Sequence, residues 1–390
     1  MFTLIKNADV YAPEHLGKKS VLVCGERIAW VGDDFPAEKN LPGLKAVDAK
    51  GMMLMPGIID NHVHVTGGGS EGGPHMRTPE LLLSDMVKGG VTTVIGVRGT
   101  DDVSRSMEAL VAKTNGLIAE GVSAWCLTGS YQLPVKSLCG GIREDIVLID
   151  KVIGVGEIAL SDHRSSNPTF EEFMYVAAAA RVGGMLAGKS GLVNVHLGDG
   201  PGGIEYLFRA GTETEVPISQ FVPTHMNRNP DLFEQAREFA KIGGYVDFTT
   251  STTQQFLDEG EVKCSKALKI LLEDGVPASR ISFSSDGQGS MPVFDAKGNF
   301  AGMTIGRVTS IAGEFKDAIV QEKVLIEDAV RVVSTTSADH FKLPRKGYIK
   351  EGFDADIVLL DEKLDVQFVF SRGRKMMENG RVLVKGTFED

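Results

Sequence analysis

The sequence has few of the features that mark secreted, membrane-spanning or disulfide-rich proteins. Four cysteines occur in 390 residues, and none forms a Cys-x-x-Cys pair with another. A disulfide framework and a structural zinc knuckle are therefore not expected. No apolar run approaches the roughly 18 residues of a membrane-spanning helix, and residues 1–12 contain no apolar signal-peptide block. We expect a cytoplasmic protein with no membrane partner.

Positive charge is also scarce. Lysine and arginine number 41 against 52 aspartates and glutamates, so the formal net charge is -11, and no basic run occurs. Because nucleic-acid binding depends on clustered Lys and Arg, a nucleic-acid partner is excluded. The hydrophobic share of 42% is ordinary for a globular protein, and the length allows one large domain and a smaller one.

Both ends of the chain have the pattern of short β-strands. Runs such as 20–24 and 27–31 near the start, and 356–360 and 366–370 near the end, alternate with turn-forming Gly and Asp. Since isolated hairpins are marginally stable, we expect the two ends to pair. The sequence thus predicts a small β-sandwich domain from residues 1–55 plus 346–390.

The middle of the chain, residues 56–345, alternates short β-rich runs with helical patterns. We count eight such runs, which end near His64, Val97, Thr128, Leu160, His196, His225, Thr250 and Asp286. Repeated βα units build a parallel sheet. Eight units favour an α/β fold of the TIM-like (β/α)8 barrel type, although a doubly wound open sheet fits the alternation nearly as well.

The polar residues at the ends of these runs favour the barrel. His62 and His64 are two residues apart on one predicted strand, so both imidazoles project from the same face. An isolated His-x-His is more often a pair of turn histidines. However, His196, His225 and Asp286 also end predicted strands, and the chain has only eight histidines. In a barrel, such residues converge at the C-terminal mouth, where the chemistry occurs.

Imidazoles with a carboxylate suit zinc or a similar first-row metal, and this set is about large enough for two divalent ions. A metal-bound hydroxide would attack a carbonyl that the second ion polarises. Asp286 would take the proton of the hydroxide and pass it to the leaving nitrogen. The pattern therefore predicts a zinc-dependent amide hydrolase. His15, His75 and His340 fit surface or core positions, and His163 is undecided.

Six segments carry a resemblance to a known family: residues 56–64, 67–74, 127–131, 161–164, 223–229 and 284–290. With them, the sequence resembles the amidohydrolase superfamily and, within it, the isoaspartyl (β-aspartyl) dipeptidases. The first and last segments are typical of the superfamily, and the others of the dipeptidases. The resemblance implies a metallo-dipeptidase that cleaves small β-aspartyl dipeptides and forms a homo-oligomer.

The resemblance also implies a set of substrate contacts. Glu71 would hold the α-amino group, while Arg164, Thr100 and the backbone of Gly69 would hold the isoaspartyl α-carboxylate. Arg228 would bind the carboxylate of the leaving residue. These residue types suit the substrate, because guanidinium groups recognise carboxylates in a bidentate manner. Taken alone, Arg164 or Glu71 could equally form an ion pair in a barrel loop.

Two more roles follow from the same resemblance. Tyr131 would donate a hydrogen bond to the oxyanion, and Ser290 would help to place the substrate. The fourth strand departs from the family, because Glu157 occupies the position where a carboxylated lysine usually bridges two metals. Lys151 lies six residues earlier, about 20 Å along an extended strand, and so cannot replace it. We expect Glu157 to bridge the ions directly.

Two alternatives remain open from the sequence. One is another cyclic amidohydrolase, such as a dihydroorotase or dihydropyrimidinase, or a deacetylase of amino sugars. Glu71 argues against these, since a carboxylate serves a substrate ammonium better than a ureide or a sugar phosphate. The other is a catalytically silent scaffold with the same fold. Such scaffolds usually lack some metal ligands, whereas every ligand position is filled here.

Overall fold

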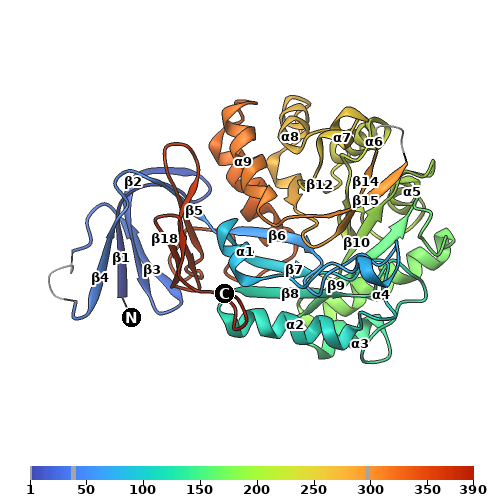
Figure 1. Ribbon diagram of the computed structural model, residues 1–390, viewed down its shortest axis with the longest axis horizontal. Helices are drawn as coiled ribbons and strands as arrows, with labels where there is room; N and C mark the ends of the chain where they lie inside the picture. The colour runs from blue at the N-terminus through green and yellow to red at the C-terminus, as the bar shows by residue number, and fades with distance from the viewer. Residues whose placement is uncertain (1, 37–40, 296–298) are drawn as a thin grey trace.

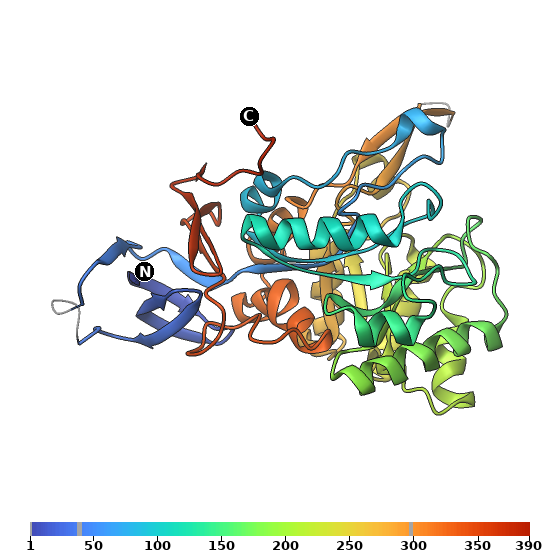
Figure 2. The same cartoon turned by 90° about the horizontal axis from the view of Figure 1, so that it is seen from below.

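The computed structural model describes residues 2–36, 41–295 and 299–390. It contains a β-rich region built from both ends of the chain and a larger α/β region built from the middle (Figure 1). The two regions lie side by side along the long axis. Both ends therefore pack at one side of the α/β region, as the turned view also shows (Figure 2).

The β-rich region is one nine-stranded sheet in which β5 pairs with β1 on one side and with β16 on the other. The N-terminal and C-terminal segments are thereby joined in one hydrogen-bonded layer. Alternating apolar residues such as Val21, Leu54, Ile357 and Phe370 form its buried core. The strands are β1 (Phe2–Tyr11), β2 (His15–Cys24), β3 (Arg27–Gly32), β4 (Leu44–Asp48), β5 (Met53–Pro56), β16 (Ile357–Leu360), β17 (Val366–Ser371), β18 (Arg374–Glu378) and β19 (Arg381–Val382).

The α/β region contains a strand at each of the eight predicted runs. Almost every residue in these strands is buried, as expected for a parallel sheet that is covered on both faces. The strands are β6 (Ile58–Val63), β7 (Val91–Gly96), β8 (Ser123–Thr128), β9 (Val152–Leu160), β10 (Leu192–Leu197), β11 (Phe221–Thr224), β12 (Val246–Thr249) and β13 (Ile281–Ser284).

Six of these strands, β6 to β11, form one curled parallel sheet in chain order, and β12 pairs with β13. The backbone amide of Met226 donates to Asp247 at 3.2 Å, which connects β11 to β12. The amide of His64 donates to Gly287 at 2.9 Å and connects β6 to the end of β13. The sheet therefore curls into a TIM-like barrel, and the doubly wound alternative is wrong.

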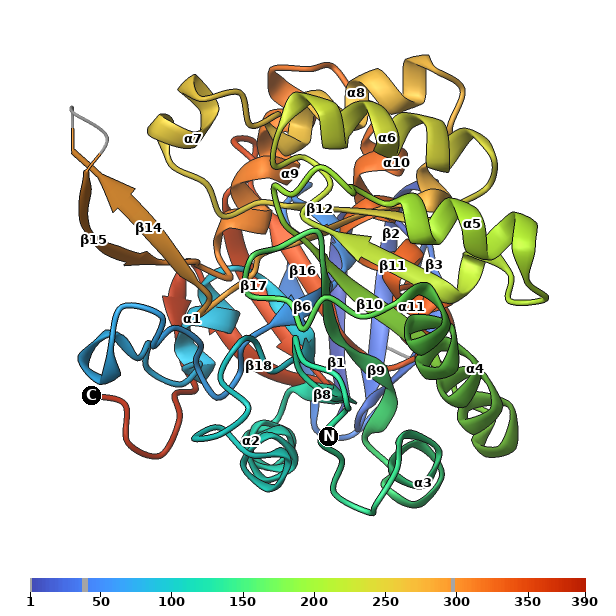
Figure 3. The ribbon, with the colours of Figure 1, turned by 90° about the vertical axis from the view of Figure 1, so that its right-hand side faces the viewer.

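Helices surround the barrel strands (Figure 3). The longest, α4, begins with a capping box in which Thr169 and Glu172 satisfy each other's backbone amides. The helices are α1 (Leu83–Lys88), α2 (Met107–Glu120), α3 (Ile142–Leu148), α4 (Phe170–Ala187), α5 (Glu205–Glu213), α6 (Pro230–Lys241), α7 (Gln254–Asp258), α8 (Cys264–Glu273), α9 (Ser310–Val320), α10 (Ile326–Val330) and α11 (Thr336–His340). Among the described residues, no helix is long and apolar enough to cross a bilayer.

After β13 the chain forms a hairpin, β14 (Ser290–Phe294) and β15 (Phe300–Ile305), that projects from the barrel (Figure 3). Ser290 is the first residue of this hairpin and lies four residues after Asp286. Met291, Phe294 and Met303 of the hairpin line the same cavity as His64 and Asp286. The hairpin thus forms one wall of the barrel mouth.

Candidate metal centre and substrate pocket

The C-terminal ends of the barrel strands converge on a cavity of about 1010 Å³. His64, Tyr131, His196, His225 and Asp286 line it, although they come from five different strand ends. This is the face on which barrel enzymes place their reacting groups. The structure therefore brings together residues that are up to about 220 positions apart in the sequence.

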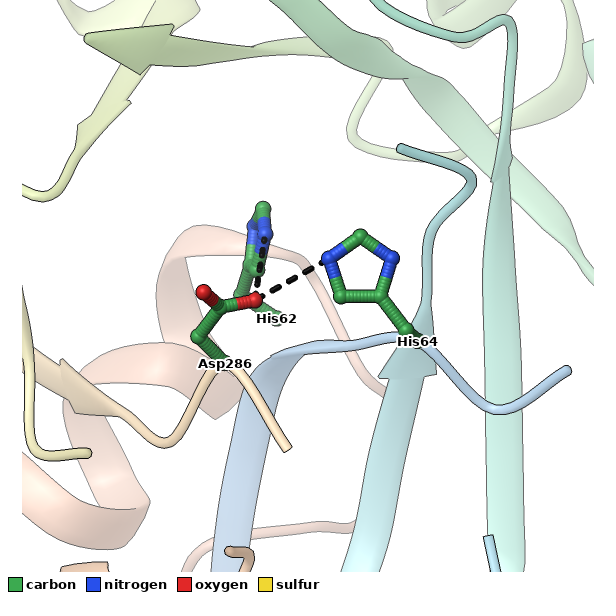
Figure 4. Close-up of side chains that lie close together, drawn as sticks. All are labelled: His62, His64 and Asp286. Atoms are coloured by element: carbon green, nitrogen blue, oxygen red, sulfur yellow. Dashed lines mark ion pairs between the residues drawn. The ribbon is translucent and has the colours of Figure 1, made fainter. Parts of the chain in front are cut away.

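Two groups of side chains, which share His62, could each hold a metal ion. Within each group, the potential ligand atoms lie within 4.8 Å of one another. One is His62, His64 and Asp286, and the other is His62, Glu157 and His225. Nε2 of His64 lies 3.0 Å from Oδ1 of Asp286, and Nε2 of His62 lies 3.8 Å from the same oxygen (Figure 4).

Glu157, at the middle of β9, lies between the histidines. Its Oε2 is 3.2 Å from His62 Nε2, 3.1 Å from His196 Nδ1 and 3.9 Å from His225 Nε2. Its Oε1 is 3.4 Å from His64 Nε2. All four histidines therefore approach this one carboxylate.

For His62 and His225, the ring nitrogen that faces away from the centre is held by a neighbouring side chain. Nδ1 of His62 lies 3.1 Å from Oδ1 of Asn194, and Nδ1 of His225 lies 2.6 Å from Oγ1 of Thr249. Such partners fix the ring orientation and leave Nε2 directed at the ion site. Sequence reasoning missed both residues. Asn194 could have been found, because it lies two residues before His196 on the same strand face.

The donor set also passes a direct test for metal binding. Among the described residues, His62 Nε2, His225 Nε2, Glu157 Oε1 and Asp286 Oδ1 are buried atoms without a hydrogen bond of acceptable geometry. Buried polar atoms are normally satisfied, so four such atoms in one cluster need an explanation. Imidazole nitrogens and carboxylate oxygens are the ligands that zinc prefers, and a cation would satisfy all four.

The electrostatics favour positive charge at the same place. Burial lowers the pKa of His62, but the charge of Glu157 outweighs this effect and raises the pKa to about 9. For Asp286, burial raises the pKa, but the hydrogen bond and charge of His64 outweigh it and lower the pKa to about 2. Burial lowers the pKa of His225 to about 3, which keeps this imidazole neutral.

Two of the predicted ligands have backbone conformations that are unusual for residues with a side chain. His225 has φ +65° and Asp286 has φ +50°, both in the left-handed region. His225 directly follows β11, and Asp286 lies two residues after the end of β13. At both positions this conformation turns the side chain into the cavity. Strained backbone of this kind concentrates at functional sites.

Glu71 occupies the centre of a second group of polar residues in the cavity. Its Oε1 accepts a hydrogen bond from Thr100 Oγ1 at 3.1 Å and lies 3.3 Å from Nη1 of Arg164. Its Oε2 accepts from Ser290 Oγ at 3.2 Å. Four residues that the sequence implied as substrate contacts therefore lie together.

The other implied residues lie around the same cavity. The Tyr131 hydroxyl is 2.8 Å from His196 Nδ1, and the guanidinium of Arg164 lies over its ring at 5.2 Å. Burial raises the pKa of Tyr131 well above its usual value, so the phenol remains a donor. Arg228 lies farther along the wall, where Nη1 is 4.0 Å from Asp199. At Gly69, with φ +80°, a Cβ would meet the Met76 carbonyl oxygen at 2.4 Å, so only glycine fits.

The remaining histidines lie away from the cluster of ligands. His15 is near the surface and pairs with Asp9, and His75 lies in a short turn near the pocket rim. His340 is buried and stacks on Tyr245. The side chain of His163, which the sequence left undecided, is 89% exposed and lies at the edge of the cavity. Lys151 precedes β9 and pairs with Asp150, as expected for a lysine at the other end of the strand.

The protein-family model for the amidohydrolase family matches residues 53–386, which is most of the chain. The chain therefore belongs to the amidohydrolase family, whose members are metal-dependent hydrolases. Within this family it belongs with the β-aspartyl dipeptidases. The β-aspartyl dipeptidase of Fervidobacterium islandicum AW-1, solved in complex with the dipeptide β-Asp-Leu, is 44% identical, with a TM-score of 0.90 over 98% of both chains.

A second structure of that enzyme is 43% identical, also over 98% of both chains, with a TM-score of 0.89. Among curated proteins, the dihydroorotase of Lactobacillus johnsonii is 34% identical over 110 residues. That alignment covers 28% of this chain and only 24% of the dihydroorotase. The likeness to the dipeptidase therefore extends over the whole fold, whereas the likeness to dihydroorotase is local.

Proposed function

We propose that this protein hydrolyses the isopeptide bond of small β-aspartyl dipeptides. The observation that carries the proposal is the position of Glu71, held by Thr100, Ser290 and Arg164, in the same cavity as the metal-ligand cluster. An amide substrate with an ammonium and an α-carboxylate needs one anionic and one cationic partner beside the scissile bond. The solved relative with β-Asp-Leu bound supports this substrate class.

Each polar group of such a dipeptide then has a partner. Glu71 binds the α-ammonium. Arg164, with Thr100 and the backbone of Gly69, binds the α-carboxylate, and Ser290 helps to orient this end of the substrate. Arg228, on the far wall of the cavity, binds the carboxylate of the leaving residue. Charge-assisted hydrogen bonds of this kind give both affinity and orientation.

The donor atoms would suit two divalent ions, with zinc as the best match. His62 and His64 with Asp286 would hold one ion, and His196 with His225 would hold the other. Glu157, at the position where the family usually has a carboxylated lysine, would be shared between them. When bound, such ions lower the pKa of water to about 7 and polarise the substrate carbonyl.

The chain's own groups move the protons. Asp286 accepts the proton of the attacking water and delivers it to the nitrogen of the leaving amino acid. Tyr131, held neutral by its burial, donates a hydrogen bond to the carbonyl oxygen as negative charge develops there. The amide bond breaks as this nitrogen is protonated, and the products are aspartate and the free amino acid.

We also propose the organisation around this site. Residues 1–55 plus 346–390 form the small β-sandwich domain, and residues 56–345 form the catalytic barrel. The one sheet that contains strands from both ends supports this division. We further propose a homo-oligomer, as the family resemblance implies, and a cytoplasmic location, which the four free cysteines support.

The substrate test is a hydrolysis panel with β-aspartyl dipeptides, α-aspartyl dipeptides and dihydroorotate, each with and without a chelator. We expect cleavage of the β-linked set only, abolished by the chelator and restored by zinc. Cleavage of the α-linked set alone would refute the substrate assignment. Turnover of dihydroorotate in place of the dipeptides would favour a cyclic amidohydrolase, and no turnover with bound zinc would favour a silent scaffold.

The bridge is tested by counting metal ions per chain in the wild type and in Glu157→Gln. We expect two ions in the wild type and fewer in the variant, because an amide cannot bridge two cations with negative charge. Activity should fall at least about 100-fold. One tightly held ion per chain, unchanged in Glu157→Gln, would contradict the bridging role.

A further inference from the structure

Asp162 has no part in the proposed chemistry, yet its carboxylate lies between the metal centre and the substrate pocket. It follows β9 and lies in the wall of the large cavity, with only 3% of its side chain exposed. A buried carboxylate is costly unless its oxygens are fully used. The contacts of Asp162 therefore indicate its role.

The first set of contacts is with Arg164. Oδ1 of Asp162 accepts from Nε at 2.9 Å and Oδ2 accepts from Nη2 at 2.7 Å, a bidentate pair. Oδ1 also accepts from the Arg164 backbone amide at 2.8 Å. The guanidinium has five N–H groups, and this pair uses two of them. Of the others, Nη1 donates to Glu71 at 3.3 Å and Nη2 also lies 3.3 Å from His196 Nε2, so the second N–H of Nη1 remains for the α-carboxylate of a substrate.

The second contact is with His196. Its Nε2 lies 3.0 Å from Oδ2 of Asp162, while its Nδ1 lies 3.1 Å from Glu157. A carboxylate that accepts the Nε2 proton favours the tautomer in which Nδ1 is an acceptor facing Glu157 and the Tyr131 hydroxyl, which lies 2.8 Å away. His196 thus uses the opposite nitrogen from His62 and His225, and Asp162 accounts for the difference.

The same oxygen, Oδ2, serves both partners. A shift of the guanidinium moves this oxygen, and the oxygen in turn holds the imidazole. We propose that Asp162 is a positioning residue that couples the metal ligand His196 to the substrate-binding Arg164. This inference rests on the proposed function and adds a residue to it. It predicts that one substitution weakens both metal binding and recognition of the substrate's α-carboxylate.

The test uses Asp162→Asn, which keeps the shape but replaces one acceptor oxygen by a donor. Zinc affinity is measured by chelator competition, without any substrate, and should fall about 10- to 100-fold. Recognition is measured as the ratio of kcat/KM for β-aspartyl-leucine to that for β-alanyl-leucine, which lacks only the α-carboxylate. This ratio should fall about 10-fold or more, because Arg164 is no longer aligned.

Glu213→Gln is the matched control. Glu213 also accepts from an arginine, Arg209, but the pair lies on the exposed face of α5. Neither zinc affinity nor the substrate ratio should change in this variant. If Asp162→Asn does not fold, Asp162→Glu, which restores the charge at a longer reach, provides the same two measurements with smaller expected losses.

A role in loop folding alone would lower stability and leave both quantities unchanged, and that result would overturn the inference. Wild-type protein that fails to cleave β-aspartyl-leucine would instead refute the proposed function. In that case the zinc measurement still decides whether Asp162 supports His196.

Discussion

At the scale of single residues, Glu71 has both carboxylate oxygens held before a substrate arrives. Thr100 and Ser290 each donate to one of them, so a substrate ammonium meets an acceptor that is already oriented. Glu71 is about a quarter exposed and touches none of the metal ligands through a hydrogen bond in the described part of the chain. Its charge is therefore directed at the substrate.

We expect Glu71→Gln to separate substrate binding from metal binding. The amide keeps the shape but removes the charge, and a charged hydrogen bond contributes about 1.5 to 3 kcal/mol, or roughly 10- to 150-fold in kcat/KM. Zinc content should stay at the wild-type value. Steady-state kinetics with β-aspartyl-leucine and elemental analysis of the same preparation provide the check. If kcat/KM and zinc content both stay at their wild-type values, Glu71 does not bind the substrate.

Glu261, on the wall of the cavity near Arg228, should make stability depend on pH. Burial raises its pKa from 4.5 to about 7, against the opposing effects of Thr252 and Arg228. The protonated form is therefore favoured by folding. Its contribution is fully present below about pH 4.5 and is lost as the pH rises through 7.

The free energy of unfolding of Glu261→Gln, relative to that of the wild type, should therefore increase from pH 5 to pH 8. The increase should be as much as roughly 3 kcal/mol. Urea unfolding at the two pH values measures this difference, with Glu213→Gln as a control variant from the exposed surface. A difference between Glu261→Gln and wild type that shrinks towards pH 8 would contradict the assignment.

At the scale of elements, two helical glycines should respond to alanine in opposite ways. Gly116, within α2, has open space where a Cβ would go, whereas a Cβ on Gly184 in α4 would meet the Gly191 backbone at 2.7 Å. Gly116→Ala should stabilise by about 0.5 to 1 kcal/mol through reduced backbone entropy. Gly184→Ala should destabilise by about 1 to 3 kcal/mol because helix and loop must separate. Thermal and denaturant unfolding of both variants test the pair, and a shared sign would contradict it.

The barrel strands could be predicted because each has its own local signal. Every run of apolar residues between turn signals became a strand, and the residues that end them reached one mouth, because parallel strands share a direction. The polar partners of the histidines could not be predicted in this way. Thr249 holds His225 across two neighbouring strands, and that pairing depends on barrel curvature, which no local pattern encodes.

The same limit applies to the substrate pocket. Glu71 and Arg164 come from two different loops and Ser290 from the start of β14, so only the resemblance to a family indicated that they act together. The structure brings them within hydrogen-bond distance. Asp162 lies in segment 161–164, which carries part of the family resemblance, but its contacts with Arg164 and His196 depend on the three-dimensional structure.

At the scale of the whole molecule, one buried lysine ties the nine-stranded sheet to the barrel. Nζ of Lys346 lies 2.6 Å from Asp356, 2.7 Å from Asp354 and 2.5 Å from Ser123, the first residue of β8. Burial lowers the pKa of Lys346, and Asp356 opposes this effect. The buried ammonium group of Lys346 therefore depends on all of these partners for its stability.

Lys346→Met should destabilise the protein by about 3 to 5 kcal/mol, because the buried carboxylate of Asp356 loses its cation, whereas Asp354 keeps Arg27 and Arg345. Pairing this change with Asp354→Asn and Asp356→Asn should recover part of the loss, since Asp356 would no longer be a buried charge without a partner. Unfolding free energies of the single and triple variants measure this. An unaffected single variant would show that the carboxylates find other partners.

The placement of β5 between β1 and β16 also bears on how the chain is made. During translation, β1 to β5 leave the ribosome before any barrel strand, but the edge of β5 that faces β16 stays open until residues 357–360 emerge. An exposed strand edge is a template for pairing with other chains. From the synthesis of β5 until that of β16, about 300 residues later, the nascent protein therefore carries an open edge that β16 finally covers.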